Sequence, residues 1–203
     1  MTNTLIATIF YDDSIKLGIT DYKIDKAILL EDESPGDTQK TTIKEVTKYF
    51  EKLVDFQVEK IAKYDIEKVV EKCLKIIDKI PKEEKIIIDI TQGKRTQTIG
   101  LLFAAYKRFN RIEKIYYGMD IADKKYKALE LPKFKFDITE KQRIVLEGIR
   151  DNKIMNKIIV KGKVSRATAY SSVIELEEAA LITKREKENK YSLTDAGKIM
   201  LMR

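Results

Sequence analysis

The sequence predicts an α/β fold with a Rossmann-like, mostly parallel sheet, followed by a small second domain of a different kind. Three observations lead to this prediction. Up to about residue 132, apolar runs of strand length alternate with amphipathic helical segments, which is the pattern of a parallel sheet with helices on its faces. The run "KIIIDI" is apolar on both faces, as expected for a strand at the centre of such a sheet. Beyond residue 132 the alternation ends, and helical segments lead to two short charged strands.

The composition is that of a globular protein with a highly charged surface, and it restricts the chemistry. The chain has 203 residues, of which 43% are hydrophobic and 36% charged, and its net charge of +7 favours an anionic partner. A single cysteine, Cys73, excludes an intrachain disulfide and a cysteine-based metal cluster. The absence of histidine removes the commonest general base and metal ligand, so any catalysis would depend on Lys, Tyr, carboxylates or geometry.

The N-terminal stretch "MTNTLIATIF" lacks a basic region followed by a long apolar region, so no signal peptide is expected. The longest apolar runs are far shorter than the roughly 20 residues that a transmembrane helix requires. We therefore expect a cytoplasmic protein with no membrane partner.

The first domain, residues 1–132, is expected to alternate strands and helices in order. Strands are predicted at residues 5–11, 26–33, 58–64, 85–90 and 112–119, with a last strand ending in "LELP". Helices are predicted at 41–56, 65–80 and 96–109, the second one with Asp65 as its N-cap and Pro81 after its end. The helix at 41–56 is expected to place these side chains on one face: Ile43, Val46, Tyr49, Phe50, Leu53 and Val54.

The second domain, residues 137–203, is expected to be mostly helical. A capping box from Thr139 to Gln142 opens a helix, and a short basic helical segment follows it. Ser165 is a candidate cap for the next helix, and Thr194 for the last one, with two short strands between them at 182–185 and 190–193. The helix after Ser165 carries an apolar stripe made of Ala169, Val173, Leu176 and Ala180.

The pattern "VSRATAYSSVIELEEAALI" followed by "YSLTDAGK" resembles the winged helix-turn-helix family, in which a serine-led recognition helix ends in "LEEAGLI" and the wing returns through "LTxxGK". The resemblance implies that the partner is double-stranded DNA. Recognition helices commonly contact base edges through their N-terminal residues, and the charged hairpin would be the wing. The expected DNA-binding residues are Lys163, Ser165, Arg166, Thr168, Tyr170, Ser171, Lys184, Arg185, Lys187 and Lys190.

The charge distribution points to the same region. Residues 141–166 contain eight basic and two acidic side chains, an excess close to that of the whole chain. Such a cluster suits contacts with phosphates. The alternative is a solvated charged face on a domain that contacts only proteins. The basic residues are Lys141, Arg143, Arg150, Lys153, Lys157, Lys161, Lys163 and Arg166.

Residues 91–96 form a second candidate site, since they follow the carboxyl end of a central strand and open a helix. Ligands bind at that edge of open parallel sheets, and the N–H groups of a helix N-terminus attract anions. Gly93 permits a tight turn. The segment lacks the glycine pairs of a dinucleotide fingerprint and the Gly-Lys-Ser/Thr of a P-loop, so spacing alone leaves an ordinary strand-to-helix turn as an equal alternative.

The stretch "DITQGKRTQTIGLLFAAYKRF" is similar to the "N-x-T-G-G-T-K/R" strand, loop and helix of the CRISPR-associated Rossmann-fold (CARF) sensor domains. Thr91, Gly93 and Arg95 match that motif, whereas Gln92 replaces a glycine and Lys94 a threonine. The resemblance covers about the first 132 residues. Together with the second domain, the chain resembles the archaeal CRISPR-associated transcriptional regulators.

This resemblance implies a homodimer with one pocket across its two-fold axis. The ligand would be a cyclic oligoadenylate, usually cyclic tetra-adenylate, acting as an allosteric ligand with no other cofactor. The loop after the first strand would form a second wall of the pocket. The expected ligand-binding residues are Phe10, Tyr11, Asp12, Ser14, Thr91, Gln92, Gly93, Lys94, Arg95 and Thr96.

Several alternatives remain open at this point. Tyr11 would either stack on adenine or belong to the core. Asp12 and Asp13 are interpreted as loop caps, because adjacent strand residues face opposite ways and do not suit a shared metal. Two other functions are conceivable: slow cleavage of the cyclic ligand, with Lys94 and Arg95 supplying charge, or DNA binding by a dimer that no longer responds to a ligand.

Overall fold

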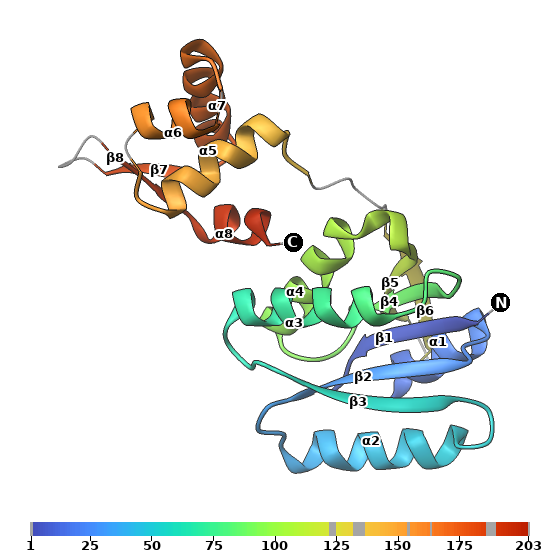
Figure 1. Cartoon of the computed structure of the whole chain (residues 1–203). Coiled ribbons are helices and arrows are strands. Elements are labelled where there is room, and N and C mark those ends of the chain that lie inside the picture. Colours follow the sequence, from blue (N-terminus) through green and yellow to red (C-terminus); the bar gives the residue numbers. More distant parts are fainter. Residues whose placement is uncertain are drawn as a thin grey trace. The chain divides into compact units, whose positions relative to one another are not determined.

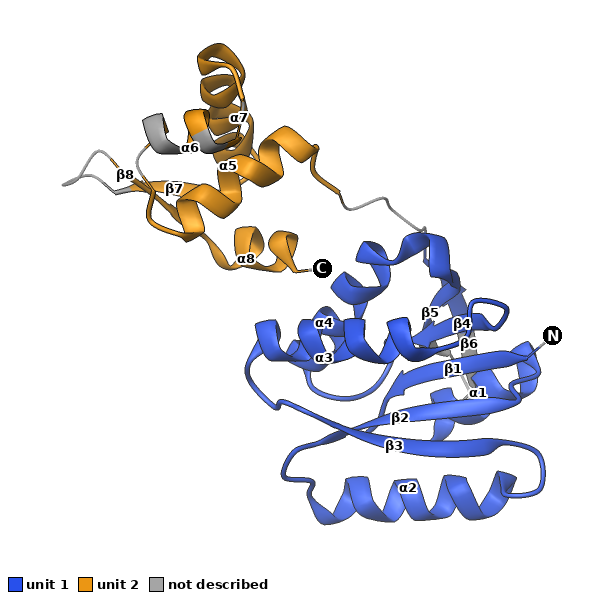
Figure 2. Cartoon of the chain, viewed as in Figure 1, with its two compact units in different colours: residues 1–135 blue, residues 136–203 orange. Residues whose placement is uncertain are grey.

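Figure 1 shows a computed structural model of the chain, which describes residues 2–121, 125–131, 137–153, 155–162, 164–185 and 190–202. The chain divides into two compact units, Met1–Lys135 and Phe136–Arg203 (Figure 2). Among the described residues, none of the helices combines the length and the apolar character needed to cross a membrane.

The first unit is built on one six-stranded sheet with the strand order β3-β2-β1-β4-β5-β6. β1 to β5 run parallel, and β6 pairs antiparallel with β5. This arrangement confirms the predicted α/β fold with a mostly parallel sheet. The strands are β1 (Asn3–Thr8), β2 (Lys26–Asp32), β3 (Asp55–Ile61), β4 (Lys85–Asp89), β5 (Ile112–Ile121) and β6 (Lys125–Glu130).

The helices of the first unit lie on both faces of this sheet. α1 and α2 connect β1, β2 and β3 on one face, and α3 and α4 lie on the opposite face (Figure 1). From β1 the chain adds β2 and β3 on one side of the sheet, and it then adds β4, β5 and β6 on the other side. The direction of strand addition reverses between β1 and β4, so these two strands form the topological switch point of the sheet. The helices are α1 (Asp13–Tyr22), α2 (Asp37–Phe50), α3 (Ile66–Lys79) and α4 (Arg95–Lys107), and a short 3-10 helix, η1 (Phe109–Arg111), follows α4.

The apolar residues of β1 show why the sheet needs helices on both sides. Leu5 and Ala7 pack with the helices α1 and α2, while Ile6 between them is buried toward the other face. On α3, Asp65 is the N-cap, as predicted, and accepts a hydrogen bond from the backbone N–H of Lys68 at 3.1 Å. Cys73 of α3 is fully buried, and burial raises the pKa of its thiol to about 12.

The helix expected at residues 41–56 differs from the observed one. α2 starts earlier, at Asp37, and ends at Phe50, where the backbone N–H groups of residues 53 and 54 both donate to the carbonyl of Phe50 and close a turn. This turn ends the helix early enough for β3 to begin at Asp55. Tyr49 and Leu53 were expected on the buried face, but their side chains are 75% and 74% exposed.

The second unit contains helices and one two-stranded hairpin. All three predicted helix caps are present, because Thr139, Ser165 and Thr194 each accept a backbone N–H bond from the residue three positions later. The two strands have the predicted bounds and pair antiparallel. The elements are α5 (Glu140–Arg150), α6 (Met155–Gly162), α7 (Arg166–Glu178), β7 (Ile182–Arg185), β8 (Lys190–Leu193) and α8 (Asp195–Leu201).

The end of α7 departs from the expected apolar stripe. Ala169, Val173 and Leu176 are buried in the core of this unit, but Ala180 is exposed and lies beyond the helix. Its φ of 54° is left-handed, a conformation that a glycine adopts more easily than an alanine. The predicted stripe was therefore one residue too long.

Candidate functional site

The switch point of the sheet brings together the two loops that the sequence singled out. β1 and β4 are neighbours, with Ala7 paired in register with Asp89, so the loops that follow them lie side by side at the carboxyl edge. The Thr8 hydroxyl donates a hydrogen bond to the carbonyl of Gln92 and so joins the two strand ends directly. Open parallel sheets bind ligands at this position.

Gly93 allows the loop after β4 to approach β1 closely. Its φ is +90°, and a Cβ atom added there would lie 2.8 Å from the Cβ of Thr8. A side chain at this position is therefore excluded both by backbone conformation and by space. The turn leads into α4, for which Lys94 is the N-cap and Arg95 the first residue.

A buried carboxylate supports the same loop from below. Asp89 is fully buried at the end of β4, and its Oδ1 accepts hydrogen bonds from both the backbone N–H and the hydroxyl of Thr91. The Thr91 oxygen accepts in turn from the N–H of Gly118 on β5, at 2.7 Å. These bonds tie the start of the loop to two strands.

Burial raises the pKa of Asp89, and the hydrogen bonds from Thr91 offset this effect only in part. Its second oxygen, Oδ2, and the hydroxyl of Ser14 are both buried, and neither has a partner at normal hydrogen-bond geometry among the described residues. Tyr116, also buried, donates its hydroxyl hydrogen to the carbonyl of Ser14 at 3.0 Å. The loop thus rests on a compact, water-excluded polar cluster.

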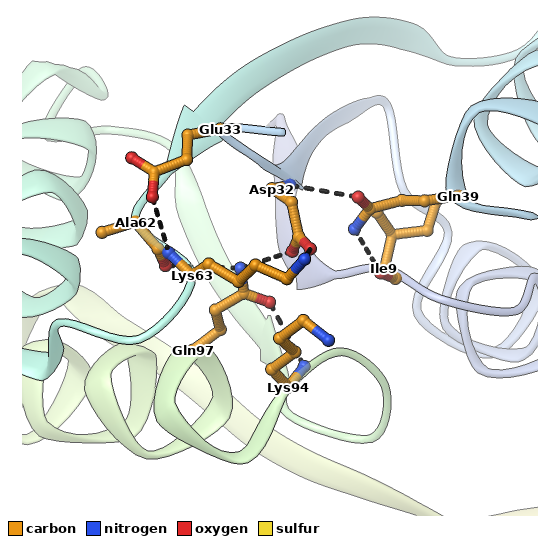
Figure 3. A network of polar contacts seen from close by, with 8 residues as sticks. All are labelled: Ile9, Asp32, Glu33, Gln39, Ala62, Lys63, Lys94 and Gln97. Carbon is orange, nitrogen blue, oxygen red and sulfur yellow. Dashed lines mark hydrogen bonds and ion pairs between the residues drawn. The ribbon is translucent and has the colours of Figure 1, made fainter. Parts of the chain in front are cut away.

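A second buried network connects the other loops at this edge (Figure 3). Its centre is Gln97 on α4, whose Nε2 donates to Oδ1 of Asp32 at 2.6 Å and whose Oε1 accepts from the N–H of Lys94 at 3.2 Å. Gln39 on α2 accepts from the N–H of Asp32 and donates to the carbonyl of Ile9, at 3.1 and 2.8 Å. The ends of β1 and β2 and the start of α4 are therefore fixed relative to one another.

The predicted residues of the first loop occupy three kinds of position. Phe10 and Tyr11 are 38% and 53% exposed, with their rings in a T-shaped contact at 4.8 Å, so Tyr11 does not belong to the core. Asp12 pairs with the ammonium of Lys16 at 2.6 Å. Ser14, by contrast, is fully buried and faces the polar cluster rather than the surface.

The predicted residues of the second loop remain accessible. Arg95 is exposed, and Thr91, Gln92, Gly93, Lys94 and Thr96 are half-buried. The ammonium of Lys94 lies 5.9 Å from the ring centre of Tyr64, in the loop after β3. The structure thus brings the two predicted loops together and adds a third loop to them.

Sequence reasoning did not identify the residues that hold these loops in place. Asp32, Gln39, Asp89 and Gln97 are all buried polar side chains. A usable signal existed for two of them, since Asp32 and Asp89 are acidic residues that end apolar strands. The glutamines gave no signal, because their partners are distant in the sequence.

In the second unit, the N-terminal part of α7 presents polar side chains to the surface. Ser165, Arg166 and Ser171 are exposed, and Tyr170 is 46% exposed. Thr168 is half-buried, and its hydroxyl lies 2.8 Å from that of Ser165.

On the hairpin, Lys184 and Lys190 are exposed, and Arg185 pairs in register with Lys190. The side chain of Arg185 lies outside the described part of the structure, as do the whole of Lys163 and Lys187. Among the predicted DNA-binding residues, the cations whose side chains are described are therefore Arg166, Lys184 and Lys190.

Some of the positive charge in residues 141–166 is neutralised locally. Arg150 and Lys153 both pair with Asp151, and the hydrogen bond from Lys153 lowers the pKa of that carboxyl. Arg143 has one guanidinium nitrogen buried without a partner among the described residues. Two of the eight cations are therefore engaged by one carboxylate, although the net charge of the segment is unchanged.

Comparisons with known proteins give a family match within the first unit and likenesses to solved structures over most of the chain. A family model described as "HFX_2341_N:-like, N-terminal" matches residues 5–121. A comparison with curated proteins gives no match. Among solved structures, Csm6 of Enterococcus italicus bound to cyclic hexa-2′-fluoro-hexa-dAMP is similar with a TM-score of 0.52 and 9% identity, over 89% of this chain and 55% of that chain. This likeness of fold supports the CARF-like architecture.

Two further solved structures are similar at lower scores. Can2 from Sulfobacillus thermosulfidooxidans in complex with cyclic tetra-adenylate has 14% identity and a TM-score of 0.48, over 98% of this chain and 63% of that chain. Protein VC1899 from Vibrio cholerae has 8% identity and a TM-score of 0.49, over 97% and 63% of the two chains. The chain spans less than two thirds of the length of each of these three structures.

Proposed function

The chain belongs to the family described as "HFX_2341_N:-like, N-terminal", and from this premise we propose that it is a ligand-controlled DNA-binding protein. The first unit would bind a cyclic oligoadenylate, with cyclic tetra-adenylate the expected ring. The second unit would be a winged helix-turn-helix domain that binds double-stranded DNA. In this proposal the chain acts as a homodimer and as a CRISPR-associated transcriptional regulator.

One observation carries the ligand part of the proposal: the loop between β4 and α4 is held in place by buried partners from the chain itself. Asp89 and Thr8 hold the start of the loop through Thr91 and Gln92, and Gly93 lets it lie against β1. The loop opens α4 with two cations, Lys94 and Arg95, at the N-terminal end of the helix, which is the positive end of its dipole. Such a fixed, electropositive turn suits a phosphate, because little ordering is needed on binding.

The likeness to CARF domains suggests the class of anion. The Csm6 structure holds a cyclic hexanucleotide, and the sequence of the loop resembles the CARF motif. A homodimer would present the same loop twice, so a ring with two-fold symmetry would meet two equivalent phosphate sites.

Calorimetry on the full chain tests the ligand part. We expect heat on titration with cyclic tetra-adenylate, and at least tenfold weaker binding when Lys94 and Arg95 are both replaced by alanine. Replacement of both Lys44 and Lys48 by alanine is the control, because both lysines are exposed on α2 and the same two charges are removed. If neither the tetra- nor the hexa-adenylate ring binds to the unsubstituted chain, the ligand assignment is wrong and a ligand-independent DNA-binding dimer becomes the better proposal.

Fluorescence anisotropy with a labelled mixed-sequence duplex tests the DNA part. Arg166→Ala should weaken binding and lower the slope of log affinity against log salt by about 1, as expected for one lost phosphate contact. Lys198→Ala in α8 removes the same charge from a lysine that pairs with Asp195 in the same unit, and should change binding little. Equal losses in the two variants would mean that overall charge, rather than the face of α7, attracts DNA.

Coupling of the two activities is tested by repeating the duplex titration with saturating ligand. Linkage requires that the factor by which the ligand changes DNA affinity equals the factor by which DNA changes ligand affinity. Equal DNA affinity in both conditions would remove the switch and leave two independent binding activities.

A second candidate function is slow cleavage of the cyclic ligand. The ammonium of Lys94 pairs with no carboxylate of the described residues, so it is available to a phosphate. Cleavage would need only a ribose 2′-hydroxyl held in line with the phosphate, together with nearby positive charge. Linear products after warm incubation, absent with Lys94→Ala, would establish it, and intact ligand would exclude it.

A further inference from the structure

The loop after β3, residues 62–65, carries an exposed aromatic ring between two cations. The side chain of Tyr64 is 76% exposed. The ammonium of Lys63 lies 5.6 Å from its ring centre, and that of Lys94 lies 5.9 Å from it. Because Lys94 belongs to the loop after β4, this cluster joins two segments that are far apart in the sequence.

The backbones that carry this cluster are held by buried hydrogen bonds. Gln97 donates to the carbonyl of Ala62 at 3.4 Å and accepts from the N–H of Lys94 at 3.2 Å, so a single side chain ties the two loops together (Figure 3). The N–H of Lys63 donates to Oε1 of Glu33, and Asp65 caps α3. The cluster is therefore built on a fixed frame rather than on a free loop.

Tyr49 shows what an ordinary exposed tyrosine looks like in the same unit. It is exposed to the same degree and also has a lysine, Lys16, near its ring at 5.8 Å. Lys16, however, is neutralised by Asp12 at 2.6 Å. At Tyr64 two ammonium groups share one ring, and the only carboxylate near either of them among the described residues is that of Asp32, 4.0 Å from Lys63.

The two ammonium groups suit an anion such as a phosphate, and the aromatic ring suits a base. Two like charges near one ring repel each other, and an anion placed between them relieves this repulsion. An exposed aromatic face gains free energy when a base stacks on it. The long, flexible lysine side chains can leave the ring face and follow a phosphate while the base occupies it.

We propose that Tyr64, with Lys63 and Lys94, forms a subsite in which one base of the nucleotide ligand stacks on the tyrosine ring and an adjacent phosphate binds both ammonium groups. This inference rests on the proposed ligand class. It gives the ligand a contact in the loop after β3, outside the loops after β1 and β4 that the sequence indicated. Lys94 then serves both parts of the site, since it borders the loop after β4 as well.

The test is calorimetry of the full chain with cyclic tetra-adenylate and, separately, cyclic hexa-adenylate, first without substitutions. Tyr64→Ala should weaken binding about tenfold, or about 1.4 kcal/mol, because one base loses the ring on which it stacks. Tyr64→Phe should keep near-normal affinity, since the ring remains. Tyr49→Ala is the matched control and should bind like the unsubstituted chain. The high exposure of Tyr64 predicts that melting temperatures stay within a degree or two, so loss of folding does not account for the result.

The possible outcomes separate the inference from the proposed function. If the unsubstituted chain binds the ring and Tyr64→Ala binds equally well, the subsite is wrong and the proposed function stands. If Tyr64→Ala and Tyr49→Ala lose affinity alike, the effect is not local, and the subsite is also wrong. If the unsubstituted chain binds neither ring, both the proposed function and the subsite fail.

Discussion

The polar residues of the two units are held in place by different kinds of contact. At the edge of the first unit, buried hydrogen bonds join residues that are far apart in the chain, such as Gln97 and Asp32, 65 positions apart, or Thr8 and Gln92, 84 apart. On α7 of the second unit the bonds are local, as between Ser165 and Thr168. The first arrangement exists only when the whole sheet is folded, whereas the second exists whenever the helix packs through its apolar side.

This difference has a consequence for how each unit tolerates substitution. The edge of the first unit should respond to loss of a single buried partner, because an unsatisfied polar group in the interior is costly. The face of α7 should accept changes at exposed positions with little loss of stability. Four substitutions examine this contrast.

The largest effect is expected for Gln97→Leu in the first unit. It removes a hydrogen-bond donor from the buried Asp32 carboxylate and from the half-buried Ala62 carbonyl, and should cost about 3 kcal/mol. Urea denaturation, with hydrogen exchange to locate the opened region, measures this loss. Gln92→Ala is the control, with an expected loss below about 0.5 kcal/mol, since Gln92 takes part through its carbonyl. Similar losses in both variants would show that the buried hydrogen bonds of Gln97 contribute no more to stability than the side chain of Gln92 does.

Gly197→Ala tests whether the second unit also contains a long-range constraint. A Cβ atom at this position in α8 would lie 2.1 Å from the backbone oxygen of Leu181. Neither backbone can yield easily, so we expect a loss of about 2 kcal/mol in a thermal melt. Gly36→Ala is the matched control, because a Cβ there meets no atom within 4 Å. A normal melt for Gly197→Ala would mean that the packing of α8 adjusts freely.

Asp89→Asn examines the pH dependence of the polar cluster below the loop. Burial raises the pKa of Asp89 above its ordinary value of 3.8, so the folded chain retains a proton that the unfolded chain releases. Stability of the unsubstituted chain should therefore fall as the pH rises from about 4 to the raised pKa. The asparagine has no such dependence, and its amide can donate to the Ser14 hydroxyl, which has no hydrogen-bond partner within the described part of the chain.

We expect the melting temperature of Asp89→Asn to rise relative to that of the unsubstituted chain as the pH increases through this window. The comparison uses melts at a series of pH values from 4 to 8. Parallel curves for the two proteins would show that Asp89 is ionised in the folded state despite its burial.

The smallest effect is expected for Ala180→Gly after α7. Ala180 has a φ of 54°, which is strained for any residue with a Cβ, and glycine relieves that strain. Part of the gain is lost because glycine also increases the freedom of the unfolded chain. A net stabilisation of about 0.5–1 kcal/mol in urea denaturation is expected. A loss of stability would mean that contacts of the alanine methyl group outweigh the strain.

Local sequence signals predicted the caps and most of the elements, but they gave no bounds for α1 and placed the third strand at 58–64 rather than at Asp55–Ile61. Asp65, Thr139, Ser165 and Thr194 were recognised from short patterns and act as caps in the structure, because capping depends on residues three positions apart. The apolar run of β4 likewise identified a central strand. The end of α2 was misplaced, since the apolar period continues past Phe50 while the chain turns there.

The sequence predicted where the candidate site lies, but not which buried residues hold its loops in place. Strand order places the carboxyl ends of β1 and β4 together, and an acidic or polar residue after each apolar run marks that edge. The cross-links through Gln39 and Gln97 depend on which helix lies beside which strand end, and that information is absent from any local pattern. Tyr64 was overlooked for the same reason, because its second lysine comes from a different loop.

Cys73 has a practical consequence for experiments on this molecule. It is the only cysteine in the sequence, it is fully buried in α3, and burial raises the pKa of its thiol to about 12. At neutral pH it is therefore nearly inert toward maleimides, because the thiolate is the reacting form. A cysteine introduced at an exposed position of either unit would then be labelled with a spectroscopic probe while Cys73 stays unlabelled. The natural chain is thus a ready background for measuring distances between the units with and without a ligand.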